Sequence, residues 1–316
     1  MILSSIIPFV STLNDVEERL WLDVLSKSMP NESVLPLRKL TDKERKLVDV
    51  AIVANPDPTD LQVLPNLVWV HSVWAGVEKM LQQRESPRYS IVRLVDPELS
   101  RAMTEAVLAW TLFLHRDMPA YAHQQSRALW QPLPYFSAKD RSVGVLGLGE
   151  LGQQAAQALE KQGFQVQGWS RTEKHIANIS CLFGEEGLAQ ILEQSDILVC
   201  LLPLTPHTEG LLGSENLAKI KPGAQLINFA RGKIIDEDAL LYELNTGRIK
   251  HAVLDVFMYE PLPRSHPFWT HPNITVLPHI SAPTTPQSAA QIVAQNIRNY
   301  RHLSLLPKTV DTQLGY

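Results

Sequence analysis

The chain has 316 residues, 45% of them hydrophobic and 20% charged, and a net charge of −4. This is the composition of an ordinary globular protein, and the length favours two domains over one. The negative charge and the absence of a lysine or arginine run argue against nucleic acid and against an anionic membrane as partners. Two cysteines are too few for a disulfide framework, so we expect a protein of the reducing cytoplasm.

The first hundred residues alternate short apolar runs with polar or helical segments. Residues 1–10 are apolar, but no basic residue precedes them and a membrane-spanning helix needs ~20 apolar residues, so we interpret residues 2–10 as a strand and not as a signal peptide. Short apolar runs separated by helices predict a parallel sheet. We expect a helix at about 16–27 and further strands at 51–54, 67–71 and 91–94.

A short turn, Trp74-Ala75-Gly76, follows the strand expected at 67–71. Loops at the carboxyl ends of strands are where open α/β sheets bind ligands. Ala75 and Gly76 lack bulky side chains and could offer backbone N–H groups to a carboxylate. A plain strand-to-helix turn fits the same residues equally well.

A long helix is expected to begin after Asp96, which is a good N-cap and is followed by Pro97 and Glu98. Residues 106–114 are apolar on every face of this helix and too few to span a membrane, so we expect them to be buried in a core or in a contact between subunits. Residues 123–139 lack clear periodicity and are expected to form a connection.

A glycine turn lies between an apolar strand at 142–146 and an Ala-rich helix at 153–162. Its spacing is G-x-G-x-x-G, in which the first glycine makes a tight turn, the second admits a pyrophosphate and the third lets helix and strand pack closely. The helix N-terminus presents unpaired N–H groups to the anion. The strand and helix on either side favour dinucleotide binding over a plain structural turn. The predicted cofactor turn consists of Gly147, Leu148, Gly149, Glu150, Leu151 and Gly152.

The next expected strand, at 165–169, ends where an NAD-binding protein usually has an acid for the ribose 2′-hydroxyl. An acid would repel a 2′-phosphate, whereas Arg171 with Lys174 nearby offers a planar fork and a second positive charge to a dianion. We therefore expect NADPH as the cofactor and NADH as a weaker alternative, and the other interpretation is a solvated surface arginine. The residues predicted for this contact are Ser170, Arg171, Thr172 and Lys174.

The alternation of strands and helices continues to the end of the chain, which predicts a doubly wound sheet. Because the final helix lies beyond the dinucleotide domain, we expect it to return to the first domain. The expected domains are 1–99 with 283–316, and 100–282. Cys200 is expected in the core and Cys181 in a polar connection. Strands are expected at 196–202, 224–228, 251–256 and 274–277, and helices at 188–194, 214–220, 236–245 and 286–302.

Three of these later strands are followed by chemically useful side chains, Arg231, then Asp255 with Glu260, then His279. An arginine for a carboxylate, a histidine for proton transfer and a carboxylate to hold that histidine are what reduction of a 2-oxo acid by a nicotinamide requires. Singly, each residue also has a structural explanation. We expect no metal site, and no role is assigned to the other strand-end and loop histidines, His207, His251, His266 and His271.

In these motifs the chain resembles the D-isomer-specific 2-hydroxyacid dehydrogenase family, and the resemblance covers most of the sequence. Its segment Trp169-Ser170-Arg171 and the stretch 73–77 are most similar to the branch of bacterial glyoxylate/hydroxypyruvate reductases A. The motifs occur in the family's order: the Ala75-Gly76 turn, Glu105, and segments 143–152, 202–208, 228–232, 254–263 and 278–279.

The resemblance implies two doubly wound parallel-sheet domains, a Rossmann dinucleotide domain and a flavodoxin-like substrate domain, with a cleft between them. It implies that Arg231 binds the substrate's carboxylate and carbonyl, that His279 is the acid/base and that Glu260 pairs with His279. Asp255 would contact the nicotinamide carboxamide or its ribose. Further predicted contacts are Leu202, Pro203 and Ala230 for the cofactor and Trp74, Ala75 and Gly76 for the substrate.

The activity implied is NADPH-dependent reduction of glyoxylate to glycolate and of hydroxypyruvate to D-glycerate, in a homodimer formed through the long helix near 100–122. Two alternatives stay open. One is an NAD-dependent dehydrogenase of the D-lactate or phosphoglycerate type, and the other is a dinucleotide-sensing scaffold without catalysis.

Overall fold

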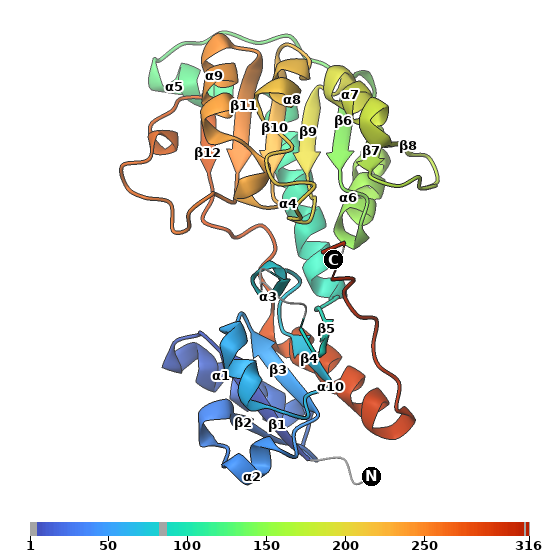
Figure 1. Ribbon diagram of the computed structural model, residues 1–316. Coiled ribbons are helices and arrows are strands. Elements are labelled where there is room, and N and C mark those ends of the chain that lie inside the picture. The colour runs from blue at the N-terminus through green and yellow to red at the C-terminus, as the bar shows by residue number, and fades with distance from the viewer. Residues whose placement is uncertain (1–4, 82–86, 313, 316) are drawn as a thin grey trace. The chain divides into compact units, whose positions relative to one another are not determined.

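The computed structural model describes residues 5–81, 87–312 and 314–315. They form two compact units, Met1–Leu99 with Thr284–Tyr316 (unit 1) and Ser100–Pro283 (unit 2) (Figure 1). Each unit is a parallel sheet with helices on both faces, so the predicted fold class is confirmed.

Unit 1 is built on a five-stranded sheet in the order β2-β1-β3-β4-β5, in which every pairing is parallel. This is the order of flavodoxin-like doubly wound sheets. The strands are β1 (Ile6–Ser11), β2 (Ser33–Pro36), β3 (Val50–Ala54), β4 (Trp69–Ser72) and β5 (Ser90–Val92). The helices are α1 (Asp15–Ser28), α2 (Asp42–Arg45), α3 (Glu78–Leu81) and α10 (Pro286–Leu303).

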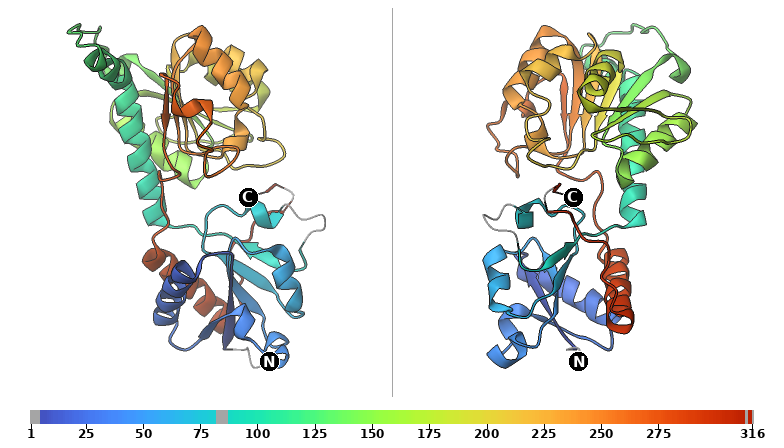
Figure 2. Two further views of the ribbon diagram at one scale, coloured as in Figure 1. Left: turned by 90° about the vertical axis from the view of Figure 1, so that its left-hand side faces the viewer. Right: turned by 45° about the vertical axis from the view of Figure 1, so that its right-hand side comes forward.

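The two faces of this sheet are covered by different helices. Successive side chains of a strand point to opposite faces, so in β3 Ile52 and Ala54 pack with α1 and α10, which lie side by side (Figure 2). Ala51 and Val53 point the other way, toward a cluster that includes Met80 of α3. Because both faces are covered, β3 is buried at every position.

Unit 2 is built on a seven-stranded parallel sheet in the order β12-β11-β10-β9-β6-β7-β8. The chain order reverses beside β6, and ligands bind at such a switch point in open α/β sheets. The strands are β6 (Ser142–Leu146), β7 (Gln165–Ser170), β8 (Ser180–Phe183), β9 (Ile197–Cys200), β10 (Ala224–Asn228), β11 (Ile249–Leu254) and β12 (Ile274–Val276). The helices are α4 (Pro97–His115), which begins at the end of the first segment of unit 1, and α5 (Met118–Ser126), α6 (Glu150–Lys161), α7 (Gly184–Gln194), α8 (Ser214–Lys219) and α9 (Glu237–Thr246).

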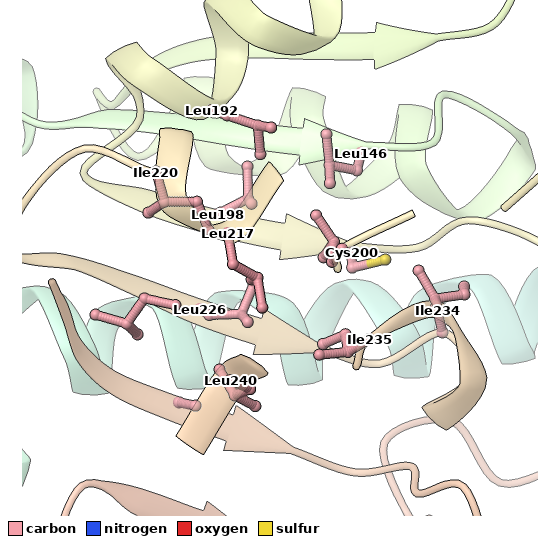
Figure 3. Close-up of a cluster of buried hydrophobic side chains, with 14 of the residues drawn as sticks. Leu146, Leu192, Leu198, Cys200, Leu217, Ile220, Leu226, Ile234, Ile235 and Leu240 are labelled. Atoms are coloured by element: carbon pink, nitrogen blue, oxygen red, sulfur yellow. The ribbon is translucent and has the colours of Figure 1, made fainter. Parts of the chain in front are cut away.

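The core of unit 2 also lies on both faces of its sheet. Figure 3 shows one face, where Leu146, Leu198 and Cys200 pack with Leu217 of α8 and Leu240 of α9. Cys200 is buried there, as expected. The opposite face is covered by α4 and α6 (Figure 2).

The helix α4 begins as predicted, because the Glu98 N–H donates to Asp96 Oδ1 at 2.8 Å. Val107 and Leu114 are buried, whereas Leu112 is 38% exposed within the chain. The helix is therefore not enclosed on every side by its own unit. None of the described helices is long and apolar enough to span a bilayer.

Several local expectations were wrong. The strands β2 and β8 were not predicted, and Cys181 lies on β8 and not in a polar connection. Both are edge strands with few fully buried residues, so the apolar pattern is weak. The helix α5 occupies the start of the expected connection. The strand expected from residue 2 is β1, and residues 1–4 lie outside the described residues.

Candidate active site

At two of the three motif glycines a larger residue would clash with the protein's own backbone. Gly147 has φ +101°, and a Cβ there would lie 2.8 Å from the Leu201 carbonyl oxygen. A Cβ at Gly152 would lie 1.7 Å from the Gly147 carbonyl oxygen. These contacts place the first turn of α6 directly on the end of β6, so the turn cannot open to fit larger residues.

The middle glycine, Gly149, differs from the other two. Its φ of −73° is open to any residue, and a Cβ there would meet no described atom within 4 Å. Gly149 is also the N-cap of α6 and provides no side-chain cap, so the first N–H groups of that helix remain available to an anion. The open space and the uncapped helix fit a dinucleotide pyrophosphate, whose close approach is the reason for glycine at this place.

The glycine turn is fastened to β7 and to the loop after it. The Gly147 N–H donates to the Trp169 carbonyl at 2.8 Å. The Leu148 side chain covers Gly168, where a Cβ would lie 2.5 Å from Leu148 Cδ2. Lys174 Nζ donates to the Leu148 carbonyl at 2.6 Å. This last bond was not predicted, since Lys174 was expected to face a phosphate.

The end of β7 carries the residues predicted to read a 2′-phosphate. Ser170 Oγ donates to the Thr172 carbonyl at 2.8 Å, which shapes the loop. Arg171 and Thr172 are exposed. Positions 170 and 171, where an NAD site would have a ribose-binding carboxylate, hold a serine and an exposed arginine, and the acid of this loop, Glu173, comes two residues later.

The structure brings His279, after β12, together with Glu260, after β11. His279 Nδ1 lies 2.7 Å from Glu260 Oε2. The Phe257 N–H donates to Glu260 Oε1 at 3.0 Å, which holds the carboxylate in place. If Nδ1 donates to Glu260, then Nε2 is the nitrogen that can exchange a proton with a substrate.

The electrostatics of this pair favour an imidazolium beside a carboxylate. The hydrogen bond to Glu260 raises the pKa of His279, and partial burial opposes it without cancelling it. Burial alone would raise the pKa of Glu260, but hydrogen bonds from His279 and Phe257 and the positive charges of His279 and Arg231 leave it below its ordinary value. The raised pKa therefore widens the pH range over which His279 is protonated and able to donate a proton.

Asp255, for which the resemblance implied a contact with the nicotinamide, makes its own contacts within the protein. Its carboxylate is buried and accepts the Ile280 N–H at 2.7 Å and the Ser281 N–H at 2.9 Å. His279 has φ +54°, a left-handed conformation that residues other than glycine seldom adopt. Asp255 thus fixes the backbone just after His279, and its charge also raises the pKa of His279.

Arg231 follows β10 in a loop organised by Asn228. The Asn228 side chain accepts the Ala230 N–H and donates to the Arg231 carbonyl, each at 3.1 Å. A Cβ at Gly232 would lie 1.9 Å from the Phe257 carbonyl carbon, so this loop lies directly against the one that holds Glu260. The positive charge of Arg231 lowers the pKa of both His279 and Glu260, which places the guanidinium within electrostatic reach of the pair.

The Leu202-Pro203 segment follows β9 and leads into a turn with its own hydrogen bonds. Thr208 Oγ1 donates to the Pro203 carbonyl at 2.6 Å and accepts the Thr205 N–H at 2.8 Å. Both threonines are buried. The turn therefore gives the predicted cofactor contacts a defined backbone beside the switch point.

The predicted substrate turn belongs to unit 1 and follows β4. The Trp74 N–H donates to Ser72 Oγ at 3.0 Å, and the Trp74 ring meets Trp21 edge-on with ring centroids 5.6 Å apart. Ala75 and Gly76 come next and are half-buried. The backbone and the ring of Trp74 are thus both held in place, and the two small residues follow it in the chain.

Sequence reasoning missed two organising residues, Glu237 and Asn228. Glu237 accepts the Met258 N–H at 3.2 Å and lies 3.3 Å from His266 Nε2, but in the sequence it is only an acid at a helix start. Asn228 could have been found, because it is a polar residue at the end of an apolar strand. Among the described residues no three His, Cys, Asp or Glu side chains are grouped to hold a metal ion.

Comparison with known proteins gives a consistent result. Residues 108–281 match the family model described as D-isomer specific 2-hydroxyacid dehydrogenase, NAD binding domain. The chain is 38% identical over 302 residues to glyoxylate/hydroxypyruvate reductase A of Photorhabdus laumondii, a match that covers 94% of this chain and 96% of the relative.

Two solved structures are similar over nearly the whole chain. One is a D-isomer specific 2-hydroxyacid dehydrogenase from Xanthobacter autotrophicus in complex with NADPH and MES, with TM-score 0.91 and 36% identity over 98% of this chain and 99% of that one. The other is the NADPH-dependent glyoxylate/hydroxypyruvate reductase of Sinorhizobium meliloti in complex with NADP and sulfate, with TM-score 0.89 and 32% identity over 99% of this chain and 100% of that one.

Proposed function

The chain belongs to the D-isomer specific 2-hydroxyacid dehydrogenase family, and from this premise we propose that it catalyses the NADPH-dependent reduction of small 2-oxo acids. The leading substrates are glyoxylate, reduced to glycolate, and hydroxypyruvate, reduced to D-glycerate. The observation that carries the proposal is the His279–Glu260 pair, with its 2.7 Å separation. It lies at the carboxyl edge of the same parallel sheet that carries the glycine turn.

The cofactor assignment is supported by the glycine turn and by the end of β7. The open space at Gly149 and the uncapped start of α6 suit a pyrophosphate. Arg171 directly follows β7, the strand after which this fold usually has the residue that contacts the ribose 2′ position. Two similar structures are complexes with NADPH or NADP. We assign NADPH as the preferred cofactor, with NADH used less well.

In the proposed mechanism the bound nicotinamide supplies the hydride to C2 of the substrate. Protonated His279 donates its proton from Nε2 to the carbonyl oxygen, and Glu260 stabilises the imidazolium before transfer. Arg231 binds the substrate's carboxylate and the developing alkoxide through its planar fork. Asp255 keeps His279 in position through the backbone that follows it. In unit 1 the Trp74–Gly76 turn remains a prediction for carboxylate binding.

We also propose that the protein is a homodimer formed through α4. The support within the chain is the partly exposed apolar side of that helix, where Leu112 is 38% exposed.

We further propose that the protein is located in the reducing cytoplasm. Cys181 and Cys200 are free thiols, which supports this location.

Oxidation of NADPH by the purified protein tests the function, with glyoxylate, hydroxypyruvate, pyruvate and 2-oxoglutarate offered separately. The proposal predicts the highest kcat/KM for glyoxylate or hydroxypyruvate. Preference for pyruvate with NADH would favour a dehydrogenase of the D-lactate type. Tight NADPH binding without turnover of any 2-oxo acid would favour the dinucleotide-sensing scaffold.

A further inference from the structure

Lys174 is placed to act on the glycine turn and not only on a phosphate. It belongs to the loop after β7, yet its ammonium donates to the Leu148 carbonyl, 26 residues earlier, at 2.6 Å. It also lines an open hollow of about 320 Å³ together with His175 and Cys181. An ammonium has three donors, so the bond to Leu148 leaves others for a ligand.

The bond fixes the direction of one particular amide. In a trans peptide the C=O and the following N–H point in opposite directions. The Leu148 carbonyl points at Lys174, so the Gly149 N–H points away from Lys174. Gly149 itself borders open space, since a Cβ there would meet no described atom within 4 Å. A cation on the carbonyl also polarises the peptide, which makes that N–H a stronger donor to an anion.

Two other contacts hold the glycine turn in place, and they act on different atoms of it. The Gly147 N–H is bonded to the Trp169 carbonyl, and the Leu148 side chain is fixed over Gly168. Both act from β7 itself. Lys174 is the contact that extends from the 2′-phosphate loop to the peptide at the pyrophosphate position.

We propose that Lys174 is a positioning residue that orients and polarises the Leu148–Gly149 peptide for the cofactor's pyrophosphate. This inference rests on the proposed dinucleotide function. Because NADH and NADPH share the pyrophosphate, Lys174 contributes to the binding of both. Arg171, by contrast, contributes to NADPH alone.

Dissociation constants for NADH and NADPH test this in the intact protein and in Lys174→Met, Lys174→Arg and Arg171→Met. Lys174→Met should weaken NADH binding about tenfold and NADPH binding at least as much, since a charged hydrogen bond is lost. Lys174→Arg keeps a donor and should recover most of the NADH affinity. Arg171→Met should weaken NADPH binding and leave NADH binding within about twofold, as expected for loss of a contact to the 2′-phosphate alone. Lys161→Met, which removes an exposed lysine at the last residue of α6, is the matched control and should bind both as the intact protein does.

Hydrogen exchange of the Gly147 amide in the cofactor-free protein gives a second readout that needs no ligand. Loss of the Lys174 bond should loosen the turn and speed that exchange roughly tenfold in Lys174→Met but not in Lys161→Met. Unchanged NADH affinity in Lys174→Met would make Lys174 a 2′-phosphate ligand and overturn the inference, and so would unchanged exchange. If the intact protein prefers NADH, only the proposed NADPH assignment is overturned. The role of Lys174 is then decided separately, by the NADH dissociation constants and by the exchange rates.

Discussion

His279 Nδ1 lies 2.7 Å from Glu260 Oε2, and the other oxygen of that carboxylate accepts the Phe257 N–H. A histidine held by a carboxylate that is itself held by the backbone has one defined ring orientation. The pair also raises the pKa of His279 and lowers that of Glu260. Geometry and charge therefore both favour a protonated and oriented His279, which the proposed proton donation requires.

The first prediction concerns the pH dependence of the reduction. Only protonated His279 can donate, so kcat/KM for 2-oxo acid reduction should fall as the pH rises through its raised pKa. Glu260→Gln removes the hydrogen-bonded charge that raises this pKa, so the fall should move to lower pH. A pH–rate profile of both proteins measures the shift. If the fall at high pH occurs at the same pH in both proteins, then it is not caused by the loss of a proton from His279 paired with Glu260.

Two glycine substitutions should separate folding from cofactor binding. Gly152→Ala would place a Cβ 1.7 Å from the Gly147 carbonyl oxygen, so it should destabilise the protein by about 1–3 kcal/mol or more. Gly149→Ala meets no described atom within 4 Å and should leave the unfolding midpoint nearly unchanged, while NADPH binding weakens. Denaturant unfolding and a dissociation constant for each variant are the measurements. Normal NADPH affinity in Gly149→Ala would argue against a pyrophosphate at this turn.

Asp255→Asn should cost stability because both carboxylate oxygens accept backbone N–H groups. The asparagine amide would turn an NH₂ group toward one of them and leave buried donors facing each other, at a cost of about 1–3 kcal/mol. Asp238→Asn, an exposed change in the first turn of α9, is the matched control. Equal unfolding free energies for the two variants would remove Asp255 from its role in holding the segment after His279.

The sequence predicted those parts of the fold that have a continuous apolar pattern. The strands β6 and β10 have the predicted bounds because each is a short buried run closed by a glycine or polar residue. The strands β2 and β8 escaped prediction because an edge strand buries fewer residues. The start of α7 also escaped, since its first turn is Gly184-Glu185-Glu186-Gly187 and carries no apolar stripe.

The candidate site could be predicted as a set of residues with one contact, the pairing of Glu260 with His279, but its other contacts could not. Motif order identified Arg231, Glu260 and His279, since each stands after a strand of one parallel sheet. The bonds of Asp255 to the backbone after His279 and of Lys174 to Leu148 join segments 25 and 26 residues apart. Such contacts depend on how loops cross after the strands are in register, which local patterns do not encode.

Cofactor choice should depend on Arg171. Its removal in Arg171→Ala takes away a charge-assisted contact to the 2′-phosphate, worth about 1.5–3 kcal/mol, or roughly ten- to a hundredfold in binding. NADH has no such phosphate and should barely respond. The observable is the ratio of kcat/KM with NADPH to kcat/KM with NADH, at saturating glyoxylate. An intact protein that prefers NADH, or a ratio unchanged by the substitution, would make Arg171 a solvated surface residue.

The most direct measurement compares NADPH oxidation by glyoxylate in the intact protein and in His279→Ala, with the NADPH dissociation constant determined for both samples. Positioned acid catalysis contributes about 10²–10⁴-fold, so turnover should fall by that factor while NADPH affinity stays within about twofold. Near-normal turnover in His279→Ala would remove His279 from the mechanism, and failure of the intact protein to oxidise NADPH with any small 2-oxo acid would contradict the proposed reductase itself.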